Sequence, residues 1–336
     1  MARTLALTGA TGFIGGALLR HLMASGWRVR ALYRARGKRR DGAPCVECVQ
    51  GTLEDPESLG RLVHGVDAVV HCAGQVRARS AAEFLRVNTD GVARLVRAAS
   101  EQACPPRFLL VSSLAAREPG LSAYAASKRG GEEMLAELAR RAPRPVPWAV
   151  LRPPAVYGPG DRDVLPLLRW MGRGLGLALG PRGARFSLLY VDDLAAAVRE
   201  WLNANPVVKG VFEVHDGQPG GYSWEELGAR IGSLRGRRVR GVRVPAAALA
   251  GLARVNTLVA GSVGRAPTLT AGKVRELRHA DWVCDNTQFT RATGWRPEIT
   301  LEEALRRSLG WTSIAARGRK ALMPRVGGGH HRGSGG

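Results

Sequence analysis

Short apolar runs alternate with longer amphipathic segments over the first half of the chain. Runs such as DAVVHC (67–72) and RFLLVS (107–112) are almost continuously apolar, which is typical of parallel strands buried on both faces of a sheet. The segments between such runs have the length and periodicity of helices. The pattern predicts these elements in order: strand 3–8, helix 12–25, strand 28–33, strand 45–49, helix 56–64, strand 67–72, helix 81–101, strand 107–112, helix 122–141 and strand 147–152.

This alternation predicts an α/β protein with a doubly wound parallel sheet. We expect a dinucleotide-binding Rossmann core over residues 1–152. Residues 153–316 are expected to form a smaller substrate-binding lobe, interleaved with the last strands and helices of the core. Residues 317–336 are basic, rich in glycine and without periodicity, so they are predicted to be a flexible tail.

Three glycines lie between the first predicted strand and the first predicted helix, at positions Gly9, Gly12 and Gly15. A turn this tight needs residues that can adopt positive φ, and a pyrophosphate approaches the backbone only where no Cβ intervenes. The N-terminus of the following helix then attracts the negative charge. The spacing therefore predicts a dinucleotide cradle.

The end of the second strand indicates which dinucleotide is bound. An acidic residue about 20 positions after the glycines would bind the ribose of NAD, but Tyr33 and then Arg34 occupy this place. Arg34 and the basic residues of 36–40 are suited to pair with a 2′-phosphate through charge-assisted hydrogen bonds. We therefore predict NADP(H) over NAD(H). Two alternatives stay open: that NAD(H) is the cofactor, and that the basic loop is solvated and binds no phosphate.

Composition narrows the class of protein. The 336 residues are 45% hydrophobic, which is enough to bury a large core, and 50 Lys and Arg against 28 Asp and Glu give a net charge of +22. Such a surface attracts phosphates, anionic lipids or nucleic acid. No nucleic-acid module is recognisable, so we expect no nucleic-acid partner. The composition leaves open whether the protein forms a homodimer.

The sequence also leads to expectations about cellular location and about the five cysteines. No apolar run is long enough to span a bilayer and no leader is visible, so we expect a cytoplasmic protein, with contact at the cytoplasmic membrane surface as an alternative. Five cysteines do not suggest a disulfide framework. Cys45 and Cys48 lack a second pair of ligands, and we expect no metal site there or at His330 and His331.

Tyr124 and Lys128 are four residues apart on a predicted helix, so they share one face. A neighbouring ammonium favours a phenolate, and we expect Lys128, together with a bound nicotinamide, to lower the pKa of Tyr124. The hydroxyl of Ser113 would hold a substrate oxygen while Tyr124 transfers the proton. The sequence thus predicts hydride and proton transfer at a carbonyl or alcohol carbon.

Several motifs occur in the order of a known family. The chain resembles the extended or atypical short-chain dehydrogenase/reductases, the NAD-dependent epimerase/dehydratase superfamily, over roughly residues 3–200. Weaker similarity to the family's C-terminal signature follows at 292–311. The motifs are TGATGFIG (8–15), HCAG (71–74), NTDG (88–91), VSS (111–113), YAASK (124–128), RPPAVYGPGD (152–161) and YVDDLA (190–195).

The resemblance implies specific residues. Ser113, Tyr124 and Lys128 match the catalytic set, and Asn88 matches the Asn of the family's N-x-x-G motif. The cofactor contacts that it implies are Gly9, Thr11, Gly12, Phe13, Ile14, Gly15, Ala73, Tyr124, Lys128 and Pro153, to which the basic-cluster argument adds Arg34.

Departures from the family pattern bear on the substrate. Gly51-Thr52-Leu53 replaces the family's usual Gly-Asp-Leu, and Phe186-Ser187-Leu188 lacks the Arg-Asp-aromatic run common in nucleotide-sugar members. These departures argue against nucleotide-sugar chemistry. The basic composition and the apolar segment 244–264 favour a hydrophobic 3-keto lipid, sphingoid, ceramide or sterol-like. A nucleotide-sugar epimerase or dehydratase and a non-catalytic NADP(H)-binding accessory protein are the alternatives. The branch resembled includes bacterial oxidised-ceramide reductases and a nucleotide-binding subunit of respiratory complex I.

The segment VPAAALAGLARVNTLVAGSVG (244–264) is apolar and rich in small residues, but it is interrupted by Arg254 and several glycines. It is too interrupted to span a bilayer. Two interpretations remain, a buried lobe helix and a lipid-facing helix. The second would suit a basic protein resting on an anionic membrane.

Overall fold

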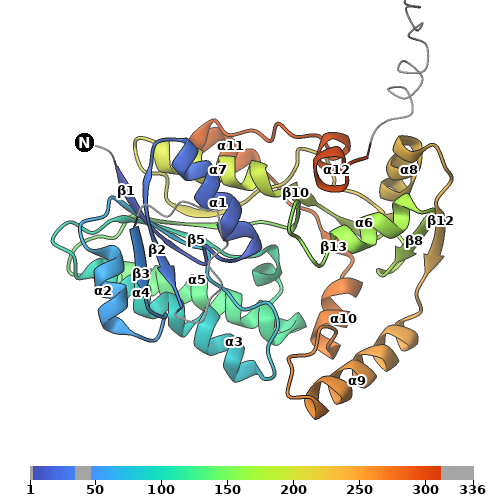
Figure 1. The fold of residues 1–336 in the computed structure, drawn as a ribbon, viewed down its shortest axis with the longest axis horizontal. Helices are drawn as coiled ribbons and strands as arrows, with labels where there is room; N and C mark the ends of the chain where they lie inside the picture. Colours follow the sequence, from blue (N-terminus) through green and yellow to red (C-terminus); the bar gives the residue numbers. More distant parts are fainter. Residues whose placement is uncertain (1–2, 35–46, 312–336) are drawn as a thin grey trace, which may run out of the picture.

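A seven-stranded parallel sheet forms the centre of the protein (Figure 1). The structure, a computed structural model, describes residues 3–34 and 47–311. The strand order is β11-β6-β5-β4-β1-β2-β3. The strands are β1 (Thr4–Thr8), β2 (Arg28–Tyr33), β3 (Glu47–Gln50), β4 (Ala68–His71), β5 (Arg107–Val111), β6 (Trp148–Arg152) and β11 (Gly210–Glu213).

Helices cover both faces of this sheet, so the predicted doubly wound α/β fold is confirmed. One face packs against α1 (Phe13–Ala24), α7 (Val191–Asn203) and α11 (Thr287–Thr293). The other face packs against α2 (Pro56–Val63), α4 (Asp90–Ser100) and α5 (Ala123–Arg141). The direction of chain progression reverses between β1 and β4, and this is where ligands bind in such sheets.

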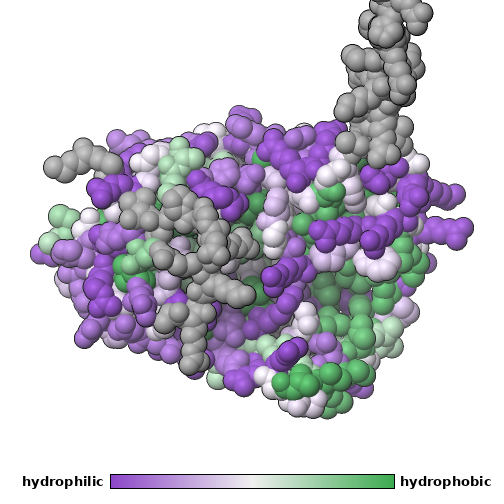
Figure 2. All heavy atoms as spheres, in the orientation of Figure 1, coloured by the Kyte–Doolittle hydropathy of each residue, from purple (hydrophilic) through white to green (hydrophobic). Residues whose placement is uncertain are grey.

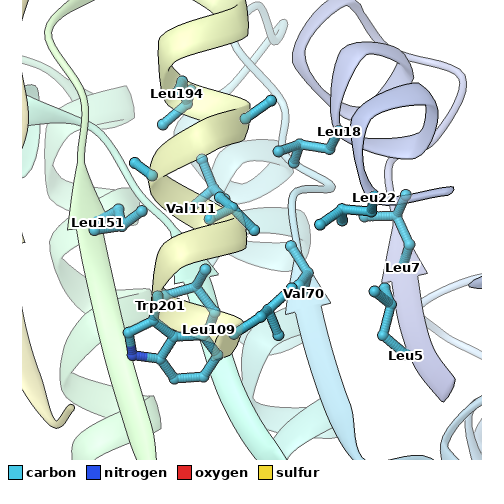
Figure 3. Packing of buried hydrophobic residues seen from close by; sticks show 14 of the residues in the cluster. Leu5, Leu7, Leu18, Leu22, Val70, Leu109, Val111, Leu151, Leu194 and Trp201 are labelled. Atoms are coloured by element: carbon cyan, nitrogen blue, oxygen red, sulfur yellow. The ribbon is translucent and has the colours of Figure 1, made fainter. Parts of the chain in front are cut away.

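Alternation along each strand divides the core into two layers. On β1, Leu5 and Leu7 point into the layer under α1 and α7, whereas Ala6 belongs to the layer under α2 and α4. Figure 3 shows the first layer, in which Leu18 and Leu22 of α1 lie beside the strands and Trp201 of α7 closes one end. Burial on both faces explains why the strands are so continuously apolar.

A smaller set of elements lies beside the sheet (Figure 1). Its strands form three parallel pairs, β7–β10, β8–β12 and β9–β13. The elements are β7 (Ala155–Tyr157), α6 (Leu165–Gly172), β8 (Leu175–Ala178), β9 (Arg185–Phe186), β10 (Leu188–Tyr190), α8 (Trp224–Arg235), β12 (Arg240–Arg243), α9 (Ala246–Ser262), α10 (Ala271–Arg278), β13 (Asp281–Trp282) and α12 (Leu301–Leu309). Because β11 returns to the central sheet, the chain passes from the core to the lobe and back more than once. The domain boundary at residue 152 stays a prediction.

The prediction of one helix over 81–101 is wrong. Two helices, α3 (Ala81–Asn88) and α4, meet at Thr89, which ends one and caps the other. The side chains of Asn88 and Thr89 both bond to Ser127 of α5, at its hydroxyl and carbonyl oxygens respectively. These tertiary bonds at consecutive residues explain a bend that the hydrophobic periodicity does not signal.

The described part of the strand expected at 45–49 is β3, from Glu47, which lies at the edge of the sheet; of its described residues, Val49 is the buried one. Cys45 of the lone C-x-x-C pair lies outside the described residues, as do the basic residues of 36–40 and the tail 317–336.

The buried-helix interpretation of 244–264 is also wrong for most of this segment. It folds as α9, and Leu252, Val255, Leu258 and Val259 on this helix are more than half exposed. Small residues and aliphatic side chains make the segment apolar, but sequence hydrophobicity does not say what covers it. Within the described residues, every helix is too short or too polar to cross a bilayer.

Candidate active site

Four neighbouring strands of the sheet end at the same edge, and a candidate residue follows each. Gly9 follows β1, Ala73 lies just beyond β4, Ser113 just beyond β5, and Pro153 directly after β6. Backbone bonds tie these strand ends together: the Leu114 N–H donates to the Pro153 carbonyl at 2.8 Å. The parallel topology therefore gathers residues that are far apart in the sequence.

The glycine turn is packed so closely that side chains do not fit. Gly9 has a φ of +78°, and a Cβ on it would lie 2.7 Å from the backbone nitrogen of Ala73. A Cβ on Gly15 would lie 2.1 Å from the Gly9 carbonyl oxygen. Gly12 donates its N–H to that oxygen at 2.9 Å and precedes α1 without a side-chain cap. Thr11 and Gly12 are exposed, while Phe13 and Ile14 are partly buried.

These residues fit a dinucleotide. The first turn of a helix leaves N–H groups without intrahelical partners, and here no side chain caps them, so a pyrophosphate can accept their hydrogen bonds. A bound nicotinamide dinucleotide supplies a hydride to, or removes one from, a substrate carbon. The described residues hold no group of three or more His, Cys, Asp or Glu arranged to bind a metal ion.

Tyr124 lies in the first turn of α5, one turn before Lys128. Its hydroxyl is hydrogen-bonded to the side chain of Ser113, and its ring packs edge-on against Phe84 of α3, with 5.9 Å between ring centroids. The structure thus brings together Ser113 and Tyr124, as the sequence predicts.

The pKa of Tyr124 departs from expectation in the opposite direction. Burial is the main cause that raises the pKa of Tyr124 to about 12; the bond from Ser113 acts to lower this pKa, and the carboxylates Glu276 and Asp163 act to raise it. The expectation that Lys128 lowers this pKa is not borne out in the structure. The ammonium of Lys128 instead donates to the Val111 carbonyl at 3.0 Å. The phenol is therefore held in its protonated form.

Lys128 is itself buried, and burial lowers its pKa, while Cys72 and Glu132 act to raise it. The backbone carbonyl at the end of β5 compensates part of the desolvation of the ammonium. Gly74 keeps this place open, because a Cβ there would lie 3.3 Å from the side-chain oxygen of Asn88 and 3.6 Å from the Lys128 nitrogen.

Asn88 is buried and bonded through its whole amide. Its Oδ1 accepts the Gln75 N–H at 2.8 Å, and its Nδ2 donates to the Gln75 carbonyl and to the Ser127 hydroxyl, both at 2.9 Å. These bonds connect the loop after β4 to the helix that carries Tyr124. The geometry suits a residue that positions the site.

The two serines after β5 have different partners. Ser112 donates to Glu132 at 2.5 Å, and this buried carboxylate also pairs with Arg152 at the end of β6. Ser113 accepts the Ala115 N–H at 3.2 Å and remains partly exposed beside Tyr124. Of the two serines, Ser112 is buried and Ser113 is the more accessible; the catalytic role of Ser113 stays a prediction.

Two residues beside the site, Glu132 and Glu276, were not predicted from the sequence. Glu132 lies four residues after Lys128, and the spacing of 124, 128 and 132 was a signal that its side chain shares the same face. Glu276 of α10 accepts a bond from Ser122, the N-cap of α5, and also pairs with Lys273. No local pattern links positions 122 and 276, so sequence spacing gave no signal for this contact.

A second contact crosses from the lobe to the core. Arg77, in the loop after β4, pairs with Asp163, which precedes α6.

Arg34 follows β2 and is exposed, and β2 is hydrogen-bonded to β1 alongside the glycine turn. This places Arg34 at the carboxyl edge of the sheet, where the ribose-binding position is expected.

A family model described as the NAD dependent epimerase/dehydratase family matches residues 5–214, more than half of the chain. The chain belongs to this family. The resemblance inferred from the motifs is thereby confirmed, and the region matched includes the glycine turn, Ser113, Tyr124 and Lys128.

Individual proteins of the family extend this comparison. The chain is 40% identical to a ceramide reductase of Caulobacter vibrioides over 92% of its own length and 94% of that protein. It is 26% identical to a 2-alkyl-3-oxoalkanoate reductase of Shewanella oneidensis, over 61% of this chain and 59% of that protein. As a member of this family, the chain is an NAD(P)-dependent oxidoreductase.

Solved structures support the fold. The UDP-glucose 4-epimerase of Thermotoga maritima, in complex with UDP-glucose, superposes with a TM-score of 0.68 at 21% identity. The match covers 95% of this chain and all of that one. At this identity the likeness concerns the arrangement of the chain.

Replacing Gly9 with Ala should weaken NAD(P)H binding by on the order of tenfold or more, because the new Cβ meets the backbone at Ala73 and the φ is unfavourable for L-residues. Gly26→Ala is the matched control, since Gly26 has a φ of +83° but nothing within 4 Å of its Cβ position. The control should lose only about 1 kcal/mol of unfolding free energy and bind the dinucleotide normally. Equal binding by both variants, in a fluorescence titration, would contradict the cradle.

Proposed function

We propose that this oxidoreductase reduces the keto group of a hydrophobic 3-keto lipid, of the sphingoid or ceramide kind, with NADP(H) as the preferred cofactor. The main support is the 40% identity to a ceramide reductase along almost the whole of both chains. Full-length similarity matters because it includes the lobe that we expect to bind the substrate. The departures at Gly51–Leu53 and Phe186–Leu188 also argue against a nucleotide sugar.

In this proposal Tyr124 is the proton donor. Its raised pKa keeps the phenol protonated at neutral pH, as carbonyl reduction requires. Ser113, bonded to the same phenol, would hold the carbonyl oxygen so that the developing negative charge is met by two hydroxyl groups. The alcohol oxygen receives its proton from Tyr124 as the carbon receives hydride.

Lys128 and Asn88 have supporting roles in the proposal. Lys128 places a positive charge one helical turn from the phenol and is proposed to hold the cofactor, as the motif implies. Asn88 fixes the loop after β4 against Ser127, between these two residues, and so acts as a positioning residue. Ala73, Pro153 and the glycine turn are proposed to line the dinucleotide, and Arg34 to pair with a 2′-phosphate.

Tyr124→Phe should lower the rate of NADPH-dependent reduction of a 3-keto ceramide by about 10²- to 10⁴-fold while cofactor affinity is retained. Ser113→Ala should also lower kcat. Ser112→Ala should mainly lower stability, by about 1 to 3 kcal/mol, since the buried Glu132 loses the hydroxyl donor and keeps only Arg152. The measurement is turnover followed by mass spectrometry of the lipid, with NADPH titrations and melting curves on each variant.

Two other results would redirect the assignment. Turnover of UDP-sugars with no activity on lipid ketones would support the nucleotide-sugar alternative. Normal cellular function of Tyr124→Phe would support an accessory role for a bound dinucleotide.

The pH dependence tests the protonation state of Tyr124. Because its pKa is raised to about 12, the phenol keeps its proton far above neutrality, and this group should not limit the reduction. We expect kcat/KM for ketone reduction to be unchanged between about pH 6 and about pH 9. A wild-type rate that falls across this range, with a midpoint that shifts in Ser113→Ala, would show that Tyr124 ionises there and would contradict the raised pKa, although it would still fit a proton donor. A rate that rises across this range would contradict the proton-donor assignment.

Arg34→Ala should raise the KM for NADPH by about tenfold and leave the KM for NADH unchanged, since a lost charge-assisted bond to a phosphate is worth about 1.5 to 3 kcal/mol. Arg28→Ala is the control, because Arg28 is equally exposed but lies at the opposite end of the same strand. If wild-type protein uses NADH better than NADPH, or if both cofactors are affected equally, the NADP(H) preference is wrong.

A further inference from the structure

The outer face of α9 is the largest cluster of exposed aliphatic side chains in the described part of the chain. Of the ten large hydrophobic residues that are exposed there, four lie on α9 and a fifth directly follows it. Leu258 is 73% exposed and Leu252 is 59% exposed. Figure 2 shows a hydrophobic patch at the lower right, where Figure 1 places α9.

The helix has two distinct faces. Leu249, Ala253 and Ala260 are buried, and the first two pack with Val274 of α10. The exposed residues Leu252, Val255, Leu258, Val259 and Val263 lie on the opposite side, at the spacing of a helical stripe. The helix is 17 residues long, about 25 Å, and it is not able to cross a bilayer, so a membrane contact would place it along the surface.

The chain around this helix is rich in cations, two of which are paired: Lys273 with Glu276 on α10, and Arg243 with Glu225. Residues 227–275 include no Asp or Glu and contain ten Arg or Lys. Three of these, Arg240, Arg254 and Arg265, are exposed before, within and after α9. An aliphatic face set among cations is the combination that anionic lipids attract, because the headgroups meet the charges and the acyl chains meet the side chains.

We propose that α9 docks this protein onto the surface of an anionic membrane, with its outer aliphatic face in the interface and the surrounding arginines against the headgroups. A second copy of the chain fits less well, because a symmetric contact through this face would oppose two sets of like charges. Nucleic acid would meet the arginines but not the aliphatic side chains. The docking goes beyond the proposed reaction and does not depend on it.

The position of α9 gives the docking a consequence for the site. α9 packs on α10, and Glu276 of α10 accepts the bond from Ser122 at the start of the helix that carries Tyr124. A membrane held by α9 would therefore be separated by one helix, α10, from the start of α5, which carries Tyr124. If the proposed function is correct, a lipid substrate would have only a short path from the bilayer.

The test is flotation of the full chain with vesicles of phosphatidylcholine alone, and of phosphatidylcholine with about one third phosphatidylglycerol. Wild-type protein should float with the anionic vesicles, and high salt should reduce the binding. The double variant Leu252→Glu, Leu258→Glu should lose binding by on the order of tenfold or more, with an unchanged melting temperature, because both side chains are exposed in the free protein.

The matched control is Trp170→Glu with Val211→Glu, which adds the same charge at two exposed hydrophobic residues outside α9. It should bind like wild type. Absence of wild-type binding, or equal binding by the α9 variant, would overturn the proposal, the latter indicating that other basic segments hold the vesicle. A wild-type dimer that the α9 variant converts to monomer would show that a second copy covers this face. Because no turnover is measured, failure here is distinct from failure of the proposed reaction.

Discussion

The site depends on how three polar side chains of α5, the partly exposed Tyr124 and the buried Lys128 and Glu132, find partners. Tyr124, Lys128 and Glu132 follow one another at four-residue intervals, and each bonds to the end of β5, at Ser113, the Val111 carbonyl and Ser112 respectively. An unpartnered polar group in this position would cost several kcal/mol. The chemistry at the phenol is therefore set by a helix and a strand that cannot slide past one another without breaking all three contacts.

This constraint explains the sign of the Tyr124 pKa. The Lys128 ammonium is committed to the strand carbonyl, and burial of the phenol dominates, so its neutral form is favoured. A protonated phenol held beside a second hydroxyl is prepared to donate a proton to a carbonyl oxygen. The lobe contributes to the same state, because Glu276 on α10 adds negative charge near the phenol while holding Ser122 at the helix start.

Local patterns predicted more of this site than of its surroundings. The glycine turn and the pair Tyr124 and Lys128 are defined by spacing within one element or one turn, and the sequence contains that information directly. The bend at Thr89 and the contact of Glu276 join residues that are remote in sequence, so no period reveals them. The direction of a pKa shift depends on burial, which the order of residues does not specify.

The same distinction applies to α9. Its sequence is apolar enough for a buried helix, and only the fold shows that one face packs on α10 while the other is exposed. An exposed aliphatic surface of this kind costs solubility unless it serves an interaction. The absence of acidic residues from 227 to 275 bears on which interaction, since a net positive rim disfavours self-association and favours an anionic surface. A reductase that takes a lipid ketone from a bilayer would need such a face close to the residues that carry out the reduction. The contact between α9 and α10 supplies that proximity.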